Sequence, residues 1–180
     1  MKKVLSLILC LLVALSVSAF AETAYTYQSF NYDESMFAEI GGEWIGLEGL
    51  GLQFYLPDIY LAAEVPEDLA ATGVLALFAT EDSSSVLSIS YGPAVNADGN
   101  AAASLEELAA YYTSVGATNV DIGIINGIPV LMSMMEATDS VNYSVLFEDG
   151  TQCLFGFTPA SDMNTAVLAG LISTTLMIAG

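Results

Sequence analysis

Residues 120–159 read VDIGIINGIPVLMSMMEATDSVNYSVLFEDGTQCLFGFTP. The stretch holds four apolar segments rich in β-branched and aromatic residues, which is typical of β-strands. Asn126-Gly127 and Asp149-Gly150 are both strong signals for the turn of a β-hairpin. The stretch therefore predicts two antiparallel hairpins, and with them the sheet that decides the fold.

The loop length of the second hairpin can be chosen from its side-chain pattern, because a shift of one residue moves every side chain to the other face. A two-residue loop would place Ser144 opposite Phe155. A three-residue loop over 148–150 instead gathers the large apolar side chains on one face. That face holds Val141, Tyr143, Val145, Phe147, Cys153, Phe155 and Phe157.

The same comparison for the first hairpin also selects a three-residue loop, here over 125–127. The predicted cross-strand pairs are Ile124 with Ile128, Ile122 with Val130 and Val120 with Met132.

The remaining segments give the order of elements along the chain. Alternating or continuous apolar runs predict strands at 43–47, 52–56, 74–80 and 86–91. Residues 74–80 are apolar on both faces, which is typical of a central strand covered on both sides. One helical turn is expected over 66–73.

Two helices are also expected. The first spans 104–115, where Ser104 and Glu107 form a capping box, and the second runs from Ser161 toward Ile178. Antiparallel strands with segregated helices indicate an α+β fold, an antiparallel β-sheet with helices packed on both faces.

The N-terminus has the pattern of a secretory signal peptide. Lys2 and Lys3 precede an apolar run over 4–17 and the small-residue site Ala19-Phe20-Ala21. A membrane anchor is the alternative, but spanning a bilayer takes roughly 20 apolar residues and the run is shorter. We therefore expect a secreted, extracellular protein with a signal peptide over 1–21.

After the signal peptide we expect a partly ordered N-terminal arm over 22–42 and a single α+β domain over 43–180. One or two of the arm's aromatic residues are expected to hold it against the domain, and an alternative role is a strip that stacks on carbohydrate. The four candidates are Tyr25, Tyr27, Phe30 and Tyr32.

Charge separates the signal peptide from the rest of the chain. Both basic residues are Lys2 and Lys3, so residues 22–180 carry all 21 acidic side chains, no basic one and a side-chain charge of −21. Without Lys or Arg, binding to nucleic acid and to anionic membranes is disfavoured. A cationic protein or a cell-envelope component is an acceptable partner, although high charge also serves solubility. We expect the protein to be a monomer and, after cleavage of the signal peptide, not to bind a membrane.

The mature chain also lacks the usual partners for catalysis. With no His or Lys, Ser–His, Cys–His and Ser–Lys activation are excluded. Cys153 lies in a strand pattern and is expected to be a buried core residue. We assign no catalytic residue and expect no enzyme. A carboxylate-only, glycosidase-like hydrolase is the alternative. Its candidate residues are Glu64, Glu67, Asp68, Glu81 and Asp82.

One stretch has the spacing of a calcium-binding loop. Asn96, Asp98, Asn100 and Glu107 occupy positions 1, 3, 5 and 12, as the oxygen ligands of an EF-hand loop do. Position 1 is Asn where Asp is usual, and position 6 is Ala101 where the bend of the loop favours Gly. A turn followed by a capped helix explains the same residues. Weak calcium binding at these four residues is therefore an alternative hypothesis, and no other cofactor is expected.

The chain resembles the PsbP/Mog-type α/β sandwich and its secreted bacterial relatives of unknown function. The resemblance covers about residues 43–180 and rests on Leu52-Gln53-Phe54-Tyr55-Leu56-Pro57 followed by Tyr60, on Ile125-Asn126-Gly127-Ile128-Pro129, and on the closing helix after Pro159. Tyr60 stands where the family more often has Trp. The resemblance implies an antiparallel sheet between helices and a role in binding or assembly, and no family site residue carries over. The sequence thus favours a secreted, acidic, non-enzymatic binding or structural module whose ligand it does not identify.

Overall fold

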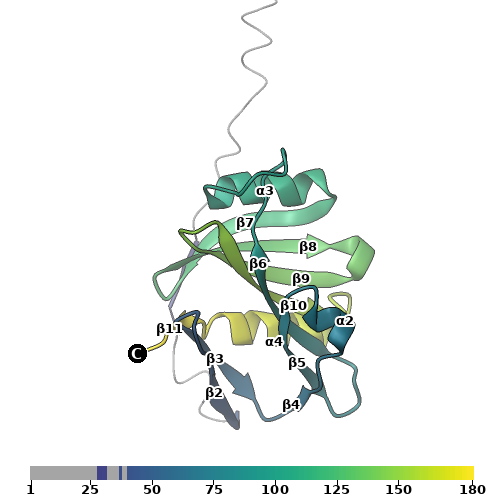
Figure 1. Cartoon of the computed structure of the whole chain (residues 1–180). Coiled ribbons are helices and arrows are strands. Elements are labelled where there is room, and N and C mark those ends of the chain that lie inside the picture. The colour runs from purple at the N-terminus through teal and green to yellow at the C-terminus, as the bar shows by residue number, and fades with distance from the viewer. Residues whose placement is uncertain (1–27, 32–36, 38–39) are drawn as a thin grey trace, which may run out of the picture.

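The main element of the fold is a sheet of eight strands (Figure 1). The computed structural model describes residues 28–31, 37 and 40–180. The predicted signal peptide, over 1–21, lies outside these residues. In the order in which they lie side by side, the strands are β1 (Gln28–Phe30), β7 (Ala117–Ile125), β8 (Ile128–Met135), β9 (Ser140–Leu146), β10 (Thr151–Thr158), β6 (Val86–Pro93), β5 (Val74–Thr80) and β4 (Tyr60–Ala63).

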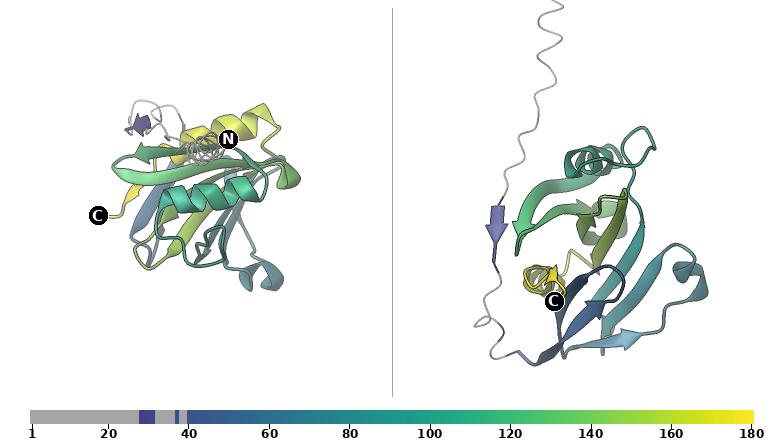
Figure 2. Two further views of the ribbon diagram at one scale, coloured as in Figure 1. Left: turned by 90° about the horizontal axis from the view of Figure 1, so that it is seen from above. Right: turned by 60° about the vertical axis from the view of Figure 1, so that its left-hand side comes forward.

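All neighbours in this sheet are antiparallel except β1 and β7, which are parallel. A second, antiparallel sheet has three strands, in the order β11 (Met177–Ile178), β3 (Leu52–Pro57) and β2 (Gly42–Leu47). The α-helices are α2 (Glu67–Ala70), α3 (Leu105–Ser114) and α4 (Met163–Ser173), and a short 3-10 helix spans Glu136–Thr138. Seen from above, α3 and α4 lie on opposite sides of the large sheet (Figure 2). The predicted α+β class, with helices on both faces, is confirmed.

The two faces of the large sheet belong to two separate apolar cores. The larger core lies between the sheet, α4 and β3, and the rings of Phe54 and Phe155 meet there edge to face with centroids 5.4 Å apart. The smaller core lies under α3, where Leu108 packs with Ile122 of β7 and Leu131 of β8. Strands β7 and β8 therefore contribute side chains to both cores.

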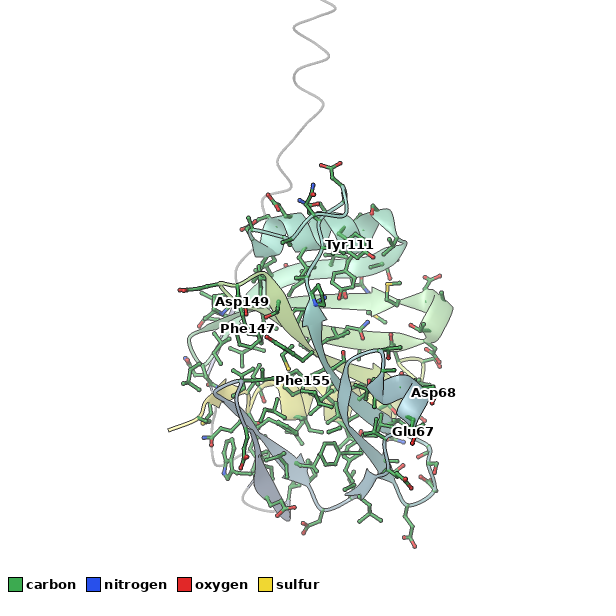
Figure 3. The ribbon with its side chains drawn as sticks, viewed as in Figure 1. Glu67, Asp68, Tyr111, Phe147, Asp149 and Phe155 are labelled. Atoms are coloured by element: carbon green, nitrogen blue, oxygen red, sulfur yellow. The ribbon has the colours of Figure 1, made fainter. Side chains whose placement is uncertain are left out.

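The β9–β10 hairpin has the predicted register. Val145 pairs with Cys153, and the N–H of Phe147 donates to the carbonyl oxygen of Thr151 at 2.8 Å to close the three-residue loop. Gly150 supplies the positive φ of +77° that this loop needs. The side chains of Phe147 and Phe155 both belong to the larger core (Figure 3).

The predicted register of the β7–β8 hairpin is wrong by one residue. Ile125 pairs with Ile128, and Ile122 pairs with Leu131. The loop has two residues, Asn126 and Gly127, with φ of +48° and +85°, the positive values of a type I′ turn. The side-chain pattern cannot select the register here, because these strands contribute apolar side chains to a core on each face. A shift of one residue would therefore move no line of apolar side chains into water.

Strand β5 is not central, although its sequence suggested that position. It is the second strand from the β4 edge of the sheet. Leu75, on β5, remains 52% exposed, so one face of this strand is only partly covered. The β4 strand itself was not predicted, and its first residue, Tyr60, is buried with its hydroxyl 2.6 Å from the Ser85 hydroxyl.

The helices were predicted at the right places, but the last one ends earlier than expected. In α3 the hydroxyl of Ser104 accepts a hydrogen bond from the N–H of Glu107 at 3.3 Å, which confirms half of the capping box. Helix α4 ends at Ser173, and β11 follows and pairs with β3. The hydroxyls of Thr174 and Thr175 donate to carbonyl oxygens three residues earlier, in the last turn of the helix. This local bonding competes with continuation of the helix.

Two parts of the predicted arm contact the rest of the protein. The backbone of β1 pairs with Gly123–Ile125 of β7. Phe37 is buried, and its ring lies edge to face with that of Tyr55 at 5.2 Å. Three of the four aromatic candidates for this role, Tyr25, Tyr27 and Tyr32, lie outside the described residues. In the described part of the chain, no helix combines the length and the apolar character that crossing a membrane requires.

Candidate functional site

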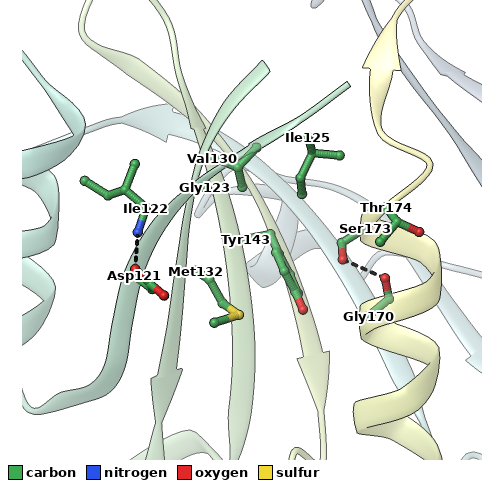
Figure 4. Close-up of a pocket in the computed structure, with 10 residues that line it drawn as sticks. All are labelled: Asp121, Ile122, Gly123, Ile125, Val130, Met132, Tyr143, Gly170, Ser173 and Thr174. Carbon is green, nitrogen blue, oxygen red and sulfur yellow. Dashed lines mark hydrogen bonds between the residues drawn. The ribbon is translucent and has the colours of Figure 1, made fainter. Parts of the chain in front are cut away.

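An apolar groove lies between the large sheet and α4 (Figure 4). Its volume is about 170 Å³. Ten residues from β7, β8, β9, α4 and the C-cap of α4 line it, namely Asp121, Ile122, Gly123, Ile125, Val130, Met132, Tyr143, Gly170, Ser173 and Thr174.

The floor of the groove comes from neighbouring positions on three strands. Gly123 pairs with Val130 across β7 and β8, and Met132 of β8 pairs with Tyr143 of β9. Gly123, which has no side chain, contributes its backbone to this floor. A glycine inside a strand is typical of such a place.

The last two turns of α4 form the wall of the groove. A Cβ atom built on Gly170 would meet no other atom within 4 Å, so the helix faces open space there. The hydroxyl of Ser173 donates to the carbonyl oxygen of Gly170 at 3.0 Å, and that of Thr174 donates to the carbonyl oxygen of Leu171 at 2.7 Å. Because these hydroxyls already bond to the helix backbone, the wall presents mainly apolar surface.

Tyr143 brings one polar atom to the groove. Burial raises the pKa of the Tyr143 phenol, and a hydrogen bond with Ser173 opposes part of that rise. The phenol is therefore neutral at physiological pH. Its ring lies perpendicular to that of Phe157, with centroids 6.1 Å apart, which holds it in place against the larger core.

Asp121 is the one charged residue among the ten that line the groove. It lies on β7 opposite Met132. Its Oδ1 accepts a hydrogen bond from the N–H of Ile122 at 3.0 Å, which orients the carboxylate (Figure 4). The groove therefore combines an apolar floor and wall with one negative charge.

The four residues of the calcium hypothesis lie elsewhere, in the loop before α3 and in its first turn. Oδ1 of Asn96 accepts from the N–H groups of Asp98 and Asn100, at 3.1 Å each. Oε2 of Glu107 accepts from Nδ2 of Asn96 at 3.3 Å and from the N–H of Ala103 at 3.0 Å. The fold thus brings Asn96 and Glu107 together, and each bonds locally.

The described residues contain no group of three or more His, Cys, Asp or Glu side chains that could hold a metal ion together. Because the calcium hypothesis also counts asparagine oxygens, it stays a prediction.

The carboxylates of the hydrolase alternative are exposed and do not line the groove. Glu67 and Asp68 lie on the short helix α2 (Figure 3). Hydrogen bonds from the hydroxyl and the N–H of Ser84, and from the hydroxyl of Thr80, lower the pKa of Asp82 to about 2. These bonds stabilise the β5–β6 turn and give Asp82 a structural role.

Cys153 lies in the larger core, as its strand position predicts. It is fully buried, and burial raises the pKa of its thiol to about 12. A thiol of this kind is a poor nucleophile, because the reactive form is the thiolate.

The sequence did not predict the groove. The sequence pattern places the lining residues on strands and a helix, and it marks none of them as a site residue. Gly123, within a strand pattern, and Gly170, within a helix pattern, were the signals available. Neither glycine alone shows that the two elements face each other.

Searches against known proteins found similarity in structure only. No family model matches the chain, and no curated protein has a significantly similar sequence. The solution structure of cyanobacterial PsbP (CyanoP) from Synechocystis sp. PCC 6803 matches with a TM-score of 0.52 and 14% identity, over 77% of this chain and 93% of that one. The fold is PsbP-like. The Ran-binding protein Mog1p of Saccharomyces cerevisiae matches with a TM-score of 0.44 and 10% identity, over 77% of this chain and 96% of that one.

The PsbP-like fold confirms the resemblance that the sequence suggested. A fold alone does not assign a function, so the function has to be argued from the groove.

Proposed function

We propose that this chain is an exported, acidic, non-enzymatic binding module that takes an apolar group of its ligand into the groove between α4 and strands β7–β9. The observation that carries the proposal is the groove itself, an open apolar space next to a well-packed core. Export is proposed from the signal-peptide pattern of residues 1–21.

The chemistry of the lining favours an apolar group. Val130 and Met132 offer apolar side chains, and the hydroxyls of Ser173 and Thr174 bond to the helix backbone. When an apolar ligand group enters the groove, water leaves the apolar surfaces of both the ligand and the groove. The hydrogen bonds of Ser173 and Thr174 to the helix backbone remain intact. Such burial is worth about 25 cal/mol per Å² of apolar surface.

The size of the groove limits what it can hold. Pockets for whole drug-sized ligands measure roughly 300–1,000 Å³. Apolar cavities of about 150 Å³ hold one benzene molecule. With a volume of about 170 Å³, the groove suits a single ring or a branched aliphatic group.

The residues that line the groove also favour binding over catalysis, because they do not include the usual catalytic groups. Residues 22–180 contain no His, Lys or Arg. Hydrolysis by carboxylates alone uses two facing carboxyl groups, whereas Asp121 is the one carboxylate among the lining residues. The hydrolase alternative is therefore less well supported than binding.

Titration with indole, followed by amide NMR, tests this proposal. We expect chemical-shift changes centred on Gly123, Met132, Tyr143 and Gly170. Gly170→Phe fills the groove and should abolish them. Val167→Phe adds the same ring at an exposed position of α4 that does not line the groove and should leave them unchanged. Absence of shifts up to millimolar indole, or shifts that persist in Gly170→Phe, would contradict the proposal.

A further inference from the structure

The groove has a charged residue at a defined place. Asp121 and Met132 are cross-strand partners, so the carboxylate lies beside an apolar part of the floor. Its Oδ1 is held by the N–H of Ile122. Within the described part of the chain, Oδ2 makes no hydrogen bond. An oriented carboxylate with one oxygen available can pair with a cation that a ligand brings.

The protein itself supplies no side chain for this pairing. Residues 22–180 contain 21 acidic side chains and no basic one. Asp121 therefore cannot form a salt bridge with another side chain of these residues, and their 21 negative charges give the protein a negative field overall. Such a field repels anionic ligands and increases the rate at which cationic ones associate.

The size of the groove indicates what carries the cation. A space of about 170 Å³ takes one aromatic or branched side chain and leaves the rest of the ligand outside. Single buried aromatic side chains are the usual anchors of protein–protein contacts. A side chain on a peptide meets this requirement, and its neighbours along the peptide would lie near Asp121.

We propose that the ligand is a basic peptide segment of a partner protein, in which an aromatic side chain enters the groove and an adjacent Lys or Arg pairs with Asp121. The inference rests on the proposed function, because it names the ligand class of the same groove.

Three capped peptides test the inference: Gly-Lys-Trp-Lys-Gly, Gly-Glu-Trp-Glu-Gly and Gly-Lys-Ala-Lys-Gly. Their dissociation constants are measured by NMR titration at low salt. We expect the Lys-Trp-Lys peptide to bind at least about tenfold more tightly than the Glu-Trp-Glu peptide, because the field attracts one and repels the other. The Lys-Ala-Lys peptide should bind weakly, because it lacks the group that fills the groove.

Variants separate the site from the overall charge. Asp121→Asn keeps an oxygen that can accept from the N–H of Ile122, and it removes the charge. This variant should bind the Lys-Trp-Lys peptide about two- to fivefold more weakly, the range for a solvent-exposed ion pair. Its affinity for the Glu-Trp-Glu peptide should not decrease. Glu148→Gln removes one charge at an exposed position outside the groove and should change neither affinity measurably.

The outcomes distinguish this inference from the proposed function. If both Trp peptides bind equally, and Asp121→Asn has no effect while Gly170→Phe abolishes binding, the groove binds apolar groups and the inference is wrong. If the Lys-Ala-Lys peptide binds as well as the Lys-Trp-Lys peptide, and Gly170→Phe has no effect, the overall negative charge of the protein attracts the peptides without a defined site. Both proposals are then overturned.

Discussion

The side-chain amide of Asn126 donates a hydrogen bond to the carbonyl oxygen of Thr174 at 2.9 Å. The same nitrogen lies 2.8 Å from the carbonyl oxygen of Leu176. Asn126 is the first residue of the β7–β8 turn, and Thr174 follows the last residue of α4. One side chain thus joins the floor of the groove to its wall and satisfies carbonyl groups that the helix end leaves without partners.

Replacing Asn126 should therefore destabilise the protein. Asn126→Asp keeps a residue that tolerates positive φ, but it removes the donor and places a carboxylate beside two carbonyl oxygens. We expect a loss of about 1–3 kcal/mol in the free energy of unfolding. Urea denaturation at pH 7 measures it. Asn119→Asp is the matched control, because Asn119 also has positive φ and, among the described residues, its amide donates to the sulfur of Met134 alone. Equal losses of unfolding free energy in the two variants would contradict the stabilising role of the hydrogen bonds that Asn126 makes to the end of α4.

Gly170→Ala should stabilise the protein. Gly is about 1 kcal/mol less favourable than Ala inside a helix, and a Cβ atom at this position meets nothing within 4 Å. We expect an increase of about 0.5–1 kcal/mol in the free energy of unfolding, measured by urea or thermal denaturation. A decrease would mean that the wall of the groove is closed and that the space described at Gly170 does not exist.

The thiol of Cys153 should be unreactive in the folded protein. Burial raises its pKa to about 12, so little thiolate forms at pH 8. We expect labelling by a thiol reagent at pH 8 to be at least about 100-fold slower in buffer than in urea, because the core must open first. Val167→Cys, at an exposed position of α4, provides the control and should label rapidly in buffer. Fast labelling of Cys153 in buffer would show that this core is open.

Asp82 should stabilise the protein in a pH-dependent way. Its pKa falls from the usual 3.8 to about 2 in the folded state, because Ser84 and Thr80 donate to the carboxylate. Its contribution is therefore fully present above pH 3.8 and is lost as the pH falls through about 2. Asp82→Asn should be less stable than the parent at pH 6, and the difference should shrink between pH 4 and 2. Glu81→Gln removes the adjacent charge and should show no such convergence.

The sequence specified the β9–β10 hairpin because its two faces differ chemically. Asn142, Ser144 and Gln152 fall on one face, and the aromatic side chains of Tyr143, Phe155 and Phe157 fall on the other, so a single register satisfies both. The β7–β8 hairpin lacks this contrast. Ile122 and Leu131 face α3, whereas Val130 faces the larger core, and either register keeps apolar residues inside. The positive φ of Asn126 and Gly127 decides the loop, and the side-chain pattern does not.

The groove and the end of α4 depend on contacts between distant residues. Met177 pairs with Gln53, and Asn126 bonds to the end of the helix, so both contacts form only when separate parts of the chain meet. Helical periodicity continues past Ser173 in the sequence and could not indicate the end. The groove exists where α4 stops covering β7 and β8, a relation that no local pattern records.

The central claim is that the groove between α4 and strands β7–β9 is where a ligand binds. Intermolecular NOEs between the protein and the Gly-Lys-Trp-Lys-Gly peptide test it most directly. The account predicts NOEs from the indole ring to the methyl groups of Val130 and Met132 and to the ring of Tyr143. NOEs to the exposed side chains of Leu61 and Leu75 on β4 and β5, with none to the groove, would contradict it.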